Sequence, residues 1–192
     1  LYSYQFSFAQ TETLNLGVDE LFTIAREKAF SGNREEARKI CRIILEKSPN
    51  YGDVRVLLGR TLAWDGRRDE ARMEFKIVLE TSPGYKDAIN ALIDVDLWDD
   101  KNEDALEIVN YGLKHYPNEE DFLIKKAKVL NYLERNEEAF VMLSKLEGIN
   151  PTNIEIFKIR EQMKQIKVRP RLYTLGISYT FENYSEYFNN MH

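Results

Sequence analysis

The sequence has very few of the residues that form metal or redox centres. Among its 192 residues there are one cysteine, Cys41, and two histidines, His115 and His192. One thiol cannot form a disulfide within the chain, and cysteine-based metal sites need several ligands at close spacing. The sequence therefore predicts no internal disulfide, no metal site and no cofactor.

Flexible linkers, long apolar runs and an excess of basic residues are also missing. Nine Gly and five Pro are too few for long linkers, and no run of about 20 apolar residues is present to form a transmembrane helix. Acidic residues outnumber basic ones by 32 to 27, whereas phosphate binding needs a clustered basic excess. This balance argues against a nucleic-acid partner.

Sequence patterns of catalysis are absent as well. The chain has no Gly-rich phosphate loop, no His-Glu-x-x-His, no Gly-x-Ser-x-Gly and no calcium loop. Acidic pairs such as Asp69-Glu70 recur, but each begins a predicted second helix, where negative charge complements the helix dipole. Cys41 falls at a core position and is interpreted as a buried, inert thiol. We therefore predict a protein that is not an enzyme and has no catalytic residues.

What the sequence does contain is an internal repeat. Two ladders share one period and keep a fixed offset from each other: Pro49, Pro83, Pro117 and Pro151, and Ala37, Ala71, Ala105 and Ala139. Two independent ladders at one period indicate four copies of one structural unit.

The shared period, 34, is that of the tetratricopeptide repeat, and residues 18–155 resemble that family. The second repeat carries the family's Leu-Gly, Ala, Phe and Pro as Leu58-Gly59, Ala71, Phe75 and Pro83. Other repeats depart from it: Ala25, Ile93 and Ala127 stand at the Gly place, and Cys41, Val109 and Leu143 at the Phe place. The resemblance implies an all-α fold, a right-handed solenoid of helical hairpins.

The residue types fit pairs of packed antiparallel helices. Ala71, Phe75, Val78 and Leu79 form one apolar stripe of a second helix, and the prolines end that helix. One hairpin cannot bury its own stripe, so neighbours must stack. A capping helix is predicted from about Ile154 to Lys167, with the capping segment of the chain assigned to residues 156–168. In it, Phe157, Met163 and Ile166 would cover the last repeat, while Glu155, Lys158, Arg160, Glu161 and Lys164 would face water.

Further ladders fall on the first helices, which line the concave side in this family. Asp19, Asp53, Asp87 and Asp121 stand at their starts, where they cap the helix or favour its dipole. Phe30, Trp64, Trp98 and Tyr132 stand near their ends. These rings either pack against the next helix or form a contact strip for a peptide, a glycan or a protein surface. Between the ladders lie Arg26, Arg60, Asp94 and Lys128. The binding-groove hypothesis comprises Phe30, Trp64, Trp98, Tyr132, Arg26, Arg60 and Lys128.

The two ends of the chain differ from the repeats. Residues 1–10 end in Ser-Phe-Ala-Gln and are interpreted as a signal-peptide remnant cut after Ala9, or as a disordered terminus. In residues 169–192, Arg169-Pro170-Arg171 stops the helix and Leu172 to Glu182 alternate in polarity, which predicts a short C-terminal β-strand tail. Its aromatic ends and length of about ten residues are typical of a strand of a transmembrane barrel. A lone strand must pair, either with another copy or within a barrel.

The tail, with Leu-Gly-Ile-Ser-Tyr-Thr-Phe-Glu-Asn-Tyr from Leu175 onward, and the Ala-Trp-Asp-Gly-Arg turn at residues 63–67 resemble YaiO-type outer-membrane β-barrel proteins. That resemblance implies a scaffold in the periplasm of a Gram-negative bacterium, attached to the first strand of a truncated outer-membrane barrel. Related architectures in polysaccharide export imply a role near glycans. The expected partner is a protein or peptide, or a glycan. The alternative is a free-standing tetratricopeptide adaptor that dimerises through its C-terminal strand.

Overall fold

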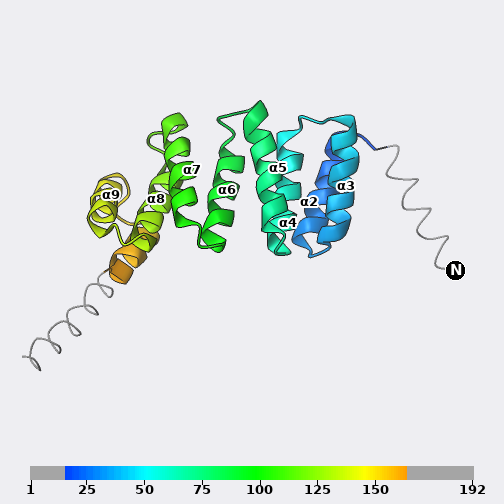
Figure 1. The fold of residues 1–192 in the computed structure, drawn as a ribbon. Coiled ribbons are helices and arrows are strands. Elements are labelled where there is room, and N and C mark those ends of the chain that lie inside the picture. The colour runs from blue at the N-terminus through cyan, green and yellow to red at the C-terminus, as the bar shows by residue number, and fades with distance from the viewer. Residues whose placement is uncertain (1–15, 164–192) are drawn as a thin grey trace, which may run out of the picture. The chain divides into compact units, whose positions relative to one another are not determined.

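The computed structural model describes residues 16–163, and all regular structure in that range is helical. The helices are α2 (Val18–Phe30), α3 (Arg34–Lys47), α4 (Gly52–Trp64), α5 (Arg68–Thr81), α6 (Lys86–Trp98), α7 (Asn102–His115), α8 (Glu120–Tyr132) and α9 (Asn136–Ile149) (Figure 1). Residues 154–163 are also helical. First helices begin at 18, 52, 86 and 120, which reproduces the repeat period of the sequence.

The chain divides into two compact units, Leu1–Pro117 and Asn118–His192. We call them the N-terminal and the C-terminal unit. In the N-terminal unit α2 packs on α3, α4 on α5 and α6 on α7, so each pair is one hairpin (Figure 1). Successive hairpins are joined by α3 against α4 and α5 against α6, and the first helices α2, α4 and α6 also touch their neighbours. The predicted all-α hairpin repeat is confirmed for these residues.

Small residues lie where the two helices of a hairpin pack against each other. Ala25 and Ala71 are fully buried, as is the ring of Phe75. A Cβ placed on Gly59 would lie 2.4 Å from Cε1 of Phe75, so only glycine lets that ring reach the backbone of α4. The small residues therefore set how closely the two helices of a hairpin approach, as the sequence predicted.

The turn inside each hairpin uses one left-handed residue at the same repeat position. It is Gly32 (φ 90°) and Gly66 (φ 78°) in the first two hairpins, and Asp100 (φ 55°) and Glu134 (φ 57°) in the next two. Glycine adopts this conformation without cost, whereas a residue with a Cβ is strained there. The second helices then end shortly before Pro49, Pro83, Pro117 and Pro151, as predicted.

In the C-terminal unit α8 packs on α9, and the helical residues 154–163 bury Ile156, Ile159 and Met163. The prediction that Phe157 covers the last repeat is wrong, since 63% of its surface is exposed. Positions 156, 159 and 163 form the buried stripe of this helix, and 157 lies off that stripe. Of the residues predicted to face water, Glu155 and Lys158 are exposed, but Arg160 and Glu161 are half-buried.

Several predictions fall outside the described residues. They are the signal-peptide remnant at 1–10, the capping-helix residues Lys164 and Ile166, and the alternating strand from Leu172 to Glu182. Within residues 16–163, none of the helices is long and apolar enough to cross a membrane.

Candidate functional site: the face of the first helices

The aromatic ladder occupies the last residue of each first helix, and most of it reaches solvent. Phe30 is 67% exposed, Trp98 49% and Tyr132 56%, while Trp64 is half-buried. Folding normally hides rings of this size, because each buries a large apolar area. Phe30 and Trp98, two large rings of residues 16–117 left in water at one repeat position, therefore mark a surface that is available for contact, and Tyr132 is a similarly exposed ring of residues 118–163.

Within the N-terminal unit the structure brings two rings of the ladder together. The centroids of Phe30 and Trp64 are 5.7 Å apart and tilted by 52°, and the Arg34 guanidinium lies over the Trp64 ring at 5.7 Å. Trp64 thus packs between a neighbouring ring and a cation, which accounts for its lower exposure. Trp98 continues the ladder on α6, the next first helix. Tyr132 belongs to the C-terminal unit.

The basic residues of the hypothesis differ in their partners. Arg26 is exposed and lies over the ring of Phe22 at 5.8 Å, and Arg60 is half-buried. Neither forms a hydrogen bond or an ion pair with any residue of 16–163. Lys128, in the C-terminal unit, forms an ion pair with Glu155. Within the described part of the chain, two cations of the predicted groove therefore have no carboxylate partner, Arg26 and Arg60.

The acidic ladder has a role that the sequence reasoning missed. The hydroxyl of Tyr51 donates to Asp19 at 3.0 Å, and Tyr85 donates to Asp53 in the same way. Each bond joins an aspartate in the first turn of one first helix to the tyrosine that immediately precedes the following first helix. The bond to Asp19 raises the pKa of Tyr51. For Tyr85, burial first and then Asp53 raise the pKa.

The aspartates do not cap the helices with their side chains, although all lie in first turns, where the dipole favours them. The dipole interpretation thus fits their positions and the capping interpretation does not. The signal for the tyrosine bonds was present in the sequence, because Tyr51 and Tyr85 are also separated by one repeat period.

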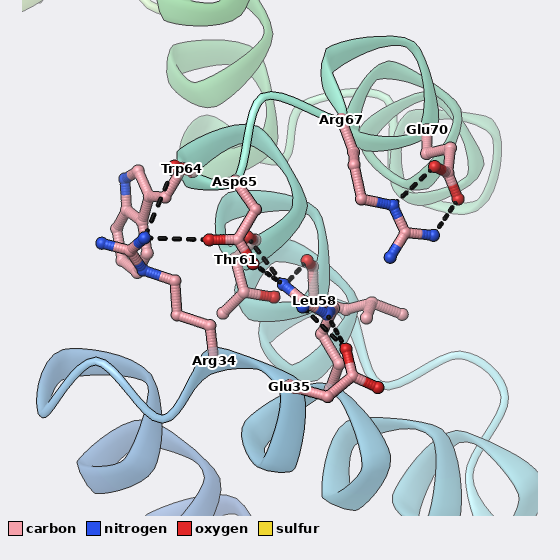
Figure 2. Close-up of polar contacts among 9 residues, drawn as sticks. Arg34, Glu35, Leu58, Thr61, Trp64, Asp65, Arg67 and Glu70 are labelled. Carbon is pink, nitrogen blue, oxygen red and sulfur yellow. Dashed lines mark hydrogen bonds and ion pairs between the residues drawn. The ribbon is translucent and has the colours of Figure 1, made fainter.

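A second set of contacts, the arginine clasp, joins successive hairpins on the side of the ring ladder. Arg34 of α3 binds Asp65, just after α4, with an N–O distance of 2.9 Å (Figure 2). Arg38 of the same helix binds the other carboxylate oxygen of Asp65 at 2.5 Å. The clasp recurs in the next repeat, where Arg68 and Arg72 bind Asp99 at 2.8 and 2.5 Å. These hydrogen bonds lower the pKa of Asp65 and of Asp99.

The second clasp contains an additional buried carboxylate. The Nε of Arg72 binds Asp96 at 2.6 Å, and their side chains are 9% and 5% exposed. Burial raises the pKa of Asp96, and the bond to Arg72 offsets only part of that effect. Leu62 occupies the equivalent position in the preceding hairpin, so the first clasp lacks this carboxylate.

The remaining candidates for chemistry are structural in the described part of the chain. In α3, α5 and α9 a first-turn acid binds a nearby arginine, as Glu70 does with Arg67 at 2.6 Å (Figure 2). Cys41 is fully buried, and burial raises the pKa of its thiol to about 12. Residues 16–163 hold no cluster of three or more His, Cys, Asp or Glu that could bind a metal ion.

No family model and no curated protein matches the chain by sequence. Solved structures match its fold. A crystal structure of MamA has a TM-score of 0.66 at 16% identity, over 86% of this chain and 97% of MamA. MamA from Desulfovibrio magneticus RS-1, residues 41 to the end, gives 0.69 at 18% identity, over 86% and 93%.

A tetratricopeptide repeat protein from Parabacteroides merdae also matches, with a TM-score of 0.69 at 17% identity, over 85% of this chain and 66% of that one. At such identities the likeness concerns the fold alone. The chain therefore has a tetratricopeptide-type helical repeat fold.

Proposed function

We propose that the protein is a non-enzymatic interaction scaffold, which docks a partner polypeptide on the face of α2, α4 and α6. The observation that carries this proposal is the exposure of Phe30 and Trp98 at equivalent positions of first helices. Trp and other aromatic side chains, with Arg, are the residues that most often dominate the energy of protein interfaces. Here the rings share one face with Arg26 and Arg60.

Photo-crosslinking tests which face is used. A photoreactive phenylalanine at position 98 should crosslink a partner in cells, whereas the same group at position 73 should not. Met73 is the matched control, because it is 64% exposed but lies on α5, a second helix. Equal adducts from both positions, or none from position 98, would contradict the proposal.

We further propose that the scaffold stands in the periplasm and is attached to an outer-membrane β-barrel. The support is the alternation of Tyr173, Leu175, Ile177, Tyr179 and Phe181 with small or polar residues, which is typical of a barrel strand. A periplasm-dependent reporter fused to the protein as its gene encodes it should be active, and the protein should sediment with outer membranes. Retention in the cytoplasm would contradict this location.

A further inference from the structure

Most arginines of the N-terminal unit are already paired with a carboxylate. Of nine in residues 16–117, the paired ones are Arg34, Arg38, Arg55, Arg67, Arg68 and Arg72. The three others are Arg26, Arg42 and Arg60. Arg42 is exposed on α3, where water satisfies its charge. Arg26 and Arg60 stand at the same repeat position of α2 and α4, which touch each other.

The surroundings of these two arginines favour an anionic ligand. Arg60 is half-buried and has no hydrogen-bond or ion-pair partner among residues 16–163, and a charge that is partly withdrawn from water gains most from an opposite charge. Of the three arginines in residues 16–117 that have no carboxylate partner there, only Arg60 is half-buried, whereas Arg26 and Arg42 are exposed. One helical turn further along α2 and α4 lie Phe30 and Trp64, so a row of cations runs beside a row of rings.

The spacing of the helices sets the spacing of the ligand's charges. Packed helix axes lie about 8–10 Å apart. A chain in the extended polyproline II conformation rises about 3.1 Å per residue with three residues per turn, so side chains three residues apart lie on the same side of it. Two carboxylates three residues apart therefore span roughly the distance between equivalent positions of α2 and α4. The row of cations ends there, because α6 carries Asp94 at the same repeat position.

We propose that this face binds an extended peptide segment in which two acidic side chains, three residues apart, contact Arg26 and Arg60. A large apolar side chain of the same segment lies against Phe30 and Trp64. This inference rests on the proposed function and specifies the chemistry of the partner.

The test uses the full chain and defined peptides. The probe is a fluorescein-labelled peptide with the segment Glu-Ala-Ala-Glu followed by Phe, and its matched control has Gln-Ala-Ala-Gln. Fluorescence anisotropy should show that the Gln peptide binds at least about ten-fold more weakly. Affinity for the Glu peptide should fall as salt rises from low to physiological concentration, because added ions screen partly exposed charges.

Charge-reversal variants locate the contact. The double variant Arg26→Glu with Arg60→Glu should lose at least about ten-fold in affinity for the Glu peptide and gain affinity for a Lys-Ala-Ala-Lys peptide. The control, Lys39→Glu with Arg42→Glu, changes the net charge equally on exposed positions of α3 and should stay within about two-fold. Circular dichroism and thermal melting of both double variants check that they fold.

Three results would overturn the inference. They are equal binding of the Glu and Gln peptides, no binding of either, or an equal loss in the two double variants. None of them contradicts the scaffold proposal, which depends on crosslinking from position 98. A crosslink there without preference for the acidic peptide would show that only the partner chemistry is wrong.

Discussion

Arg72 binds two carboxylates of the next hairpin, with its Nη2 at 2.5 Å from Asp99 and its Nε at 2.6 Å from Asp96. A third bond links the same guanidinium to the carbonyl of Val95 at 3.2 Å. One side chain of α5 therefore satisfies several acceptors at the end of α6, and most of that group is removed from water.

Replacing Arg72 by Leu should lower the free energy of unfolding by about 3–5 kcal/mol, because Asp96 would be left buried without its cation. Urea unfolding measures the change. Arg67→Leu is the matched control: its pair with Glu70 is exposed, and its loss should cost no more than about 1 kcal/mol. Adding Asp96→Leu to the first variant should restore part of the loss. Similar small losses for Arg72→Leu and Arg67→Leu would show that the clasp contributes little.

The clasps also predict an acid-sensitive stability. Asp65 and Asp99 have lowered pKa values in the folded protein, because Arg34 and Arg72, respectively, donate to them. Below the ordinary carboxyl pKa of about 3.9, the unfolded chain binds protons that the folded chain does not yet bind. Their stabilising effect is therefore complete above that pH and is lost as pH falls through the folded pKa values. Asp96 opposes this trend, since its pKa is raised.

Thermal melting between pH 7 and pH 2 measures this dependence. Asp99→Asn should be less stable than the parent at pH 7, and its melting temperature should decline less steeply in acid. Asp87→Asn is the control, because Asp87 is an exposed first-turn residue outside the clasps. If Asp99→Asn and the parent lost stability in parallel, the Asp99 carboxylate would not be the origin of the effect.

Gly59 and Gly148 should respond to alanine in opposite directions. Gly59→Ala would place a Cβ 2.4 Å from the Phe75 ring and should cost about 1–3 kcal/mol by overpacking. Gly148 in α9 has open space around its Cβ position, so alanine there should stabilise by up to about 1 kcal/mol through helix propensity. Chemical denaturation of both variants provides the measurement. A neutral Gly59→Ala would mean that the hairpin opens easily to admit a methyl group.

Glu134 should be more favourable as glycine. Its φ of 57° is left-handed, and Gly32 and Gly66 occupy the equivalent turns. Glycine should remove about 1–2 kcal/mol of backbone strain from the folded state, but it also gives the unfolded chain more conformational entropy. The net stabilisation should be about 0.5–1 kcal/mol. The converse change, Gly66→Ala, should destabilise by a similar amount. No atom crowds that position, so only the strain of a left-handed backbone contributes to the loss. A lower melting temperature for Glu134→Gly would contradict the argument.

The sequence predicted the helices well because their limits depend on local residues. Prolines stop each second helix, small residues mark the close contacts, and both recur strictly at the repeat period. The positions of Phe30, Trp64, Trp98 and Tyr132 at the ends of the first helices were predicted in the same way. Whether those rings face water depends on neighbouring hairpins, and the sequence left that question open until the structure showed their exposure.

The clasps and the tyrosine bonds were not predicted, although their residues also recur at the repeat period. Each series has only two members, since Asn102 and Leu106 replace the arginines and Glu119 replaces the tyrosine in the next repeat. Arg38 and its partner Asp65 lie far apart in the chain, and helical periodicity gives no distance across hairpins. Phe157 was misplaced for a related reason, because an isolated helix with several apolar residues does not define which of its faces is covered.

The clasps affect how much of the N-terminal unit unfolds in one cooperative step. In a linear array of repeats, stability is the sum of what each repeat contributes alone and what each shared boundary contributes. Arg38 and Arg72 act across boundaries, so they raise the coupling between hairpins and leave the energy of a single hairpin nearly unchanged. A few guanidinium groups therefore add to the coupling that apolar packing and the tyrosine bonds provide between hairpins. Hydrogen exchange in α2–α7 should follow one opening event with the clasps intact and separate into several when they are removed.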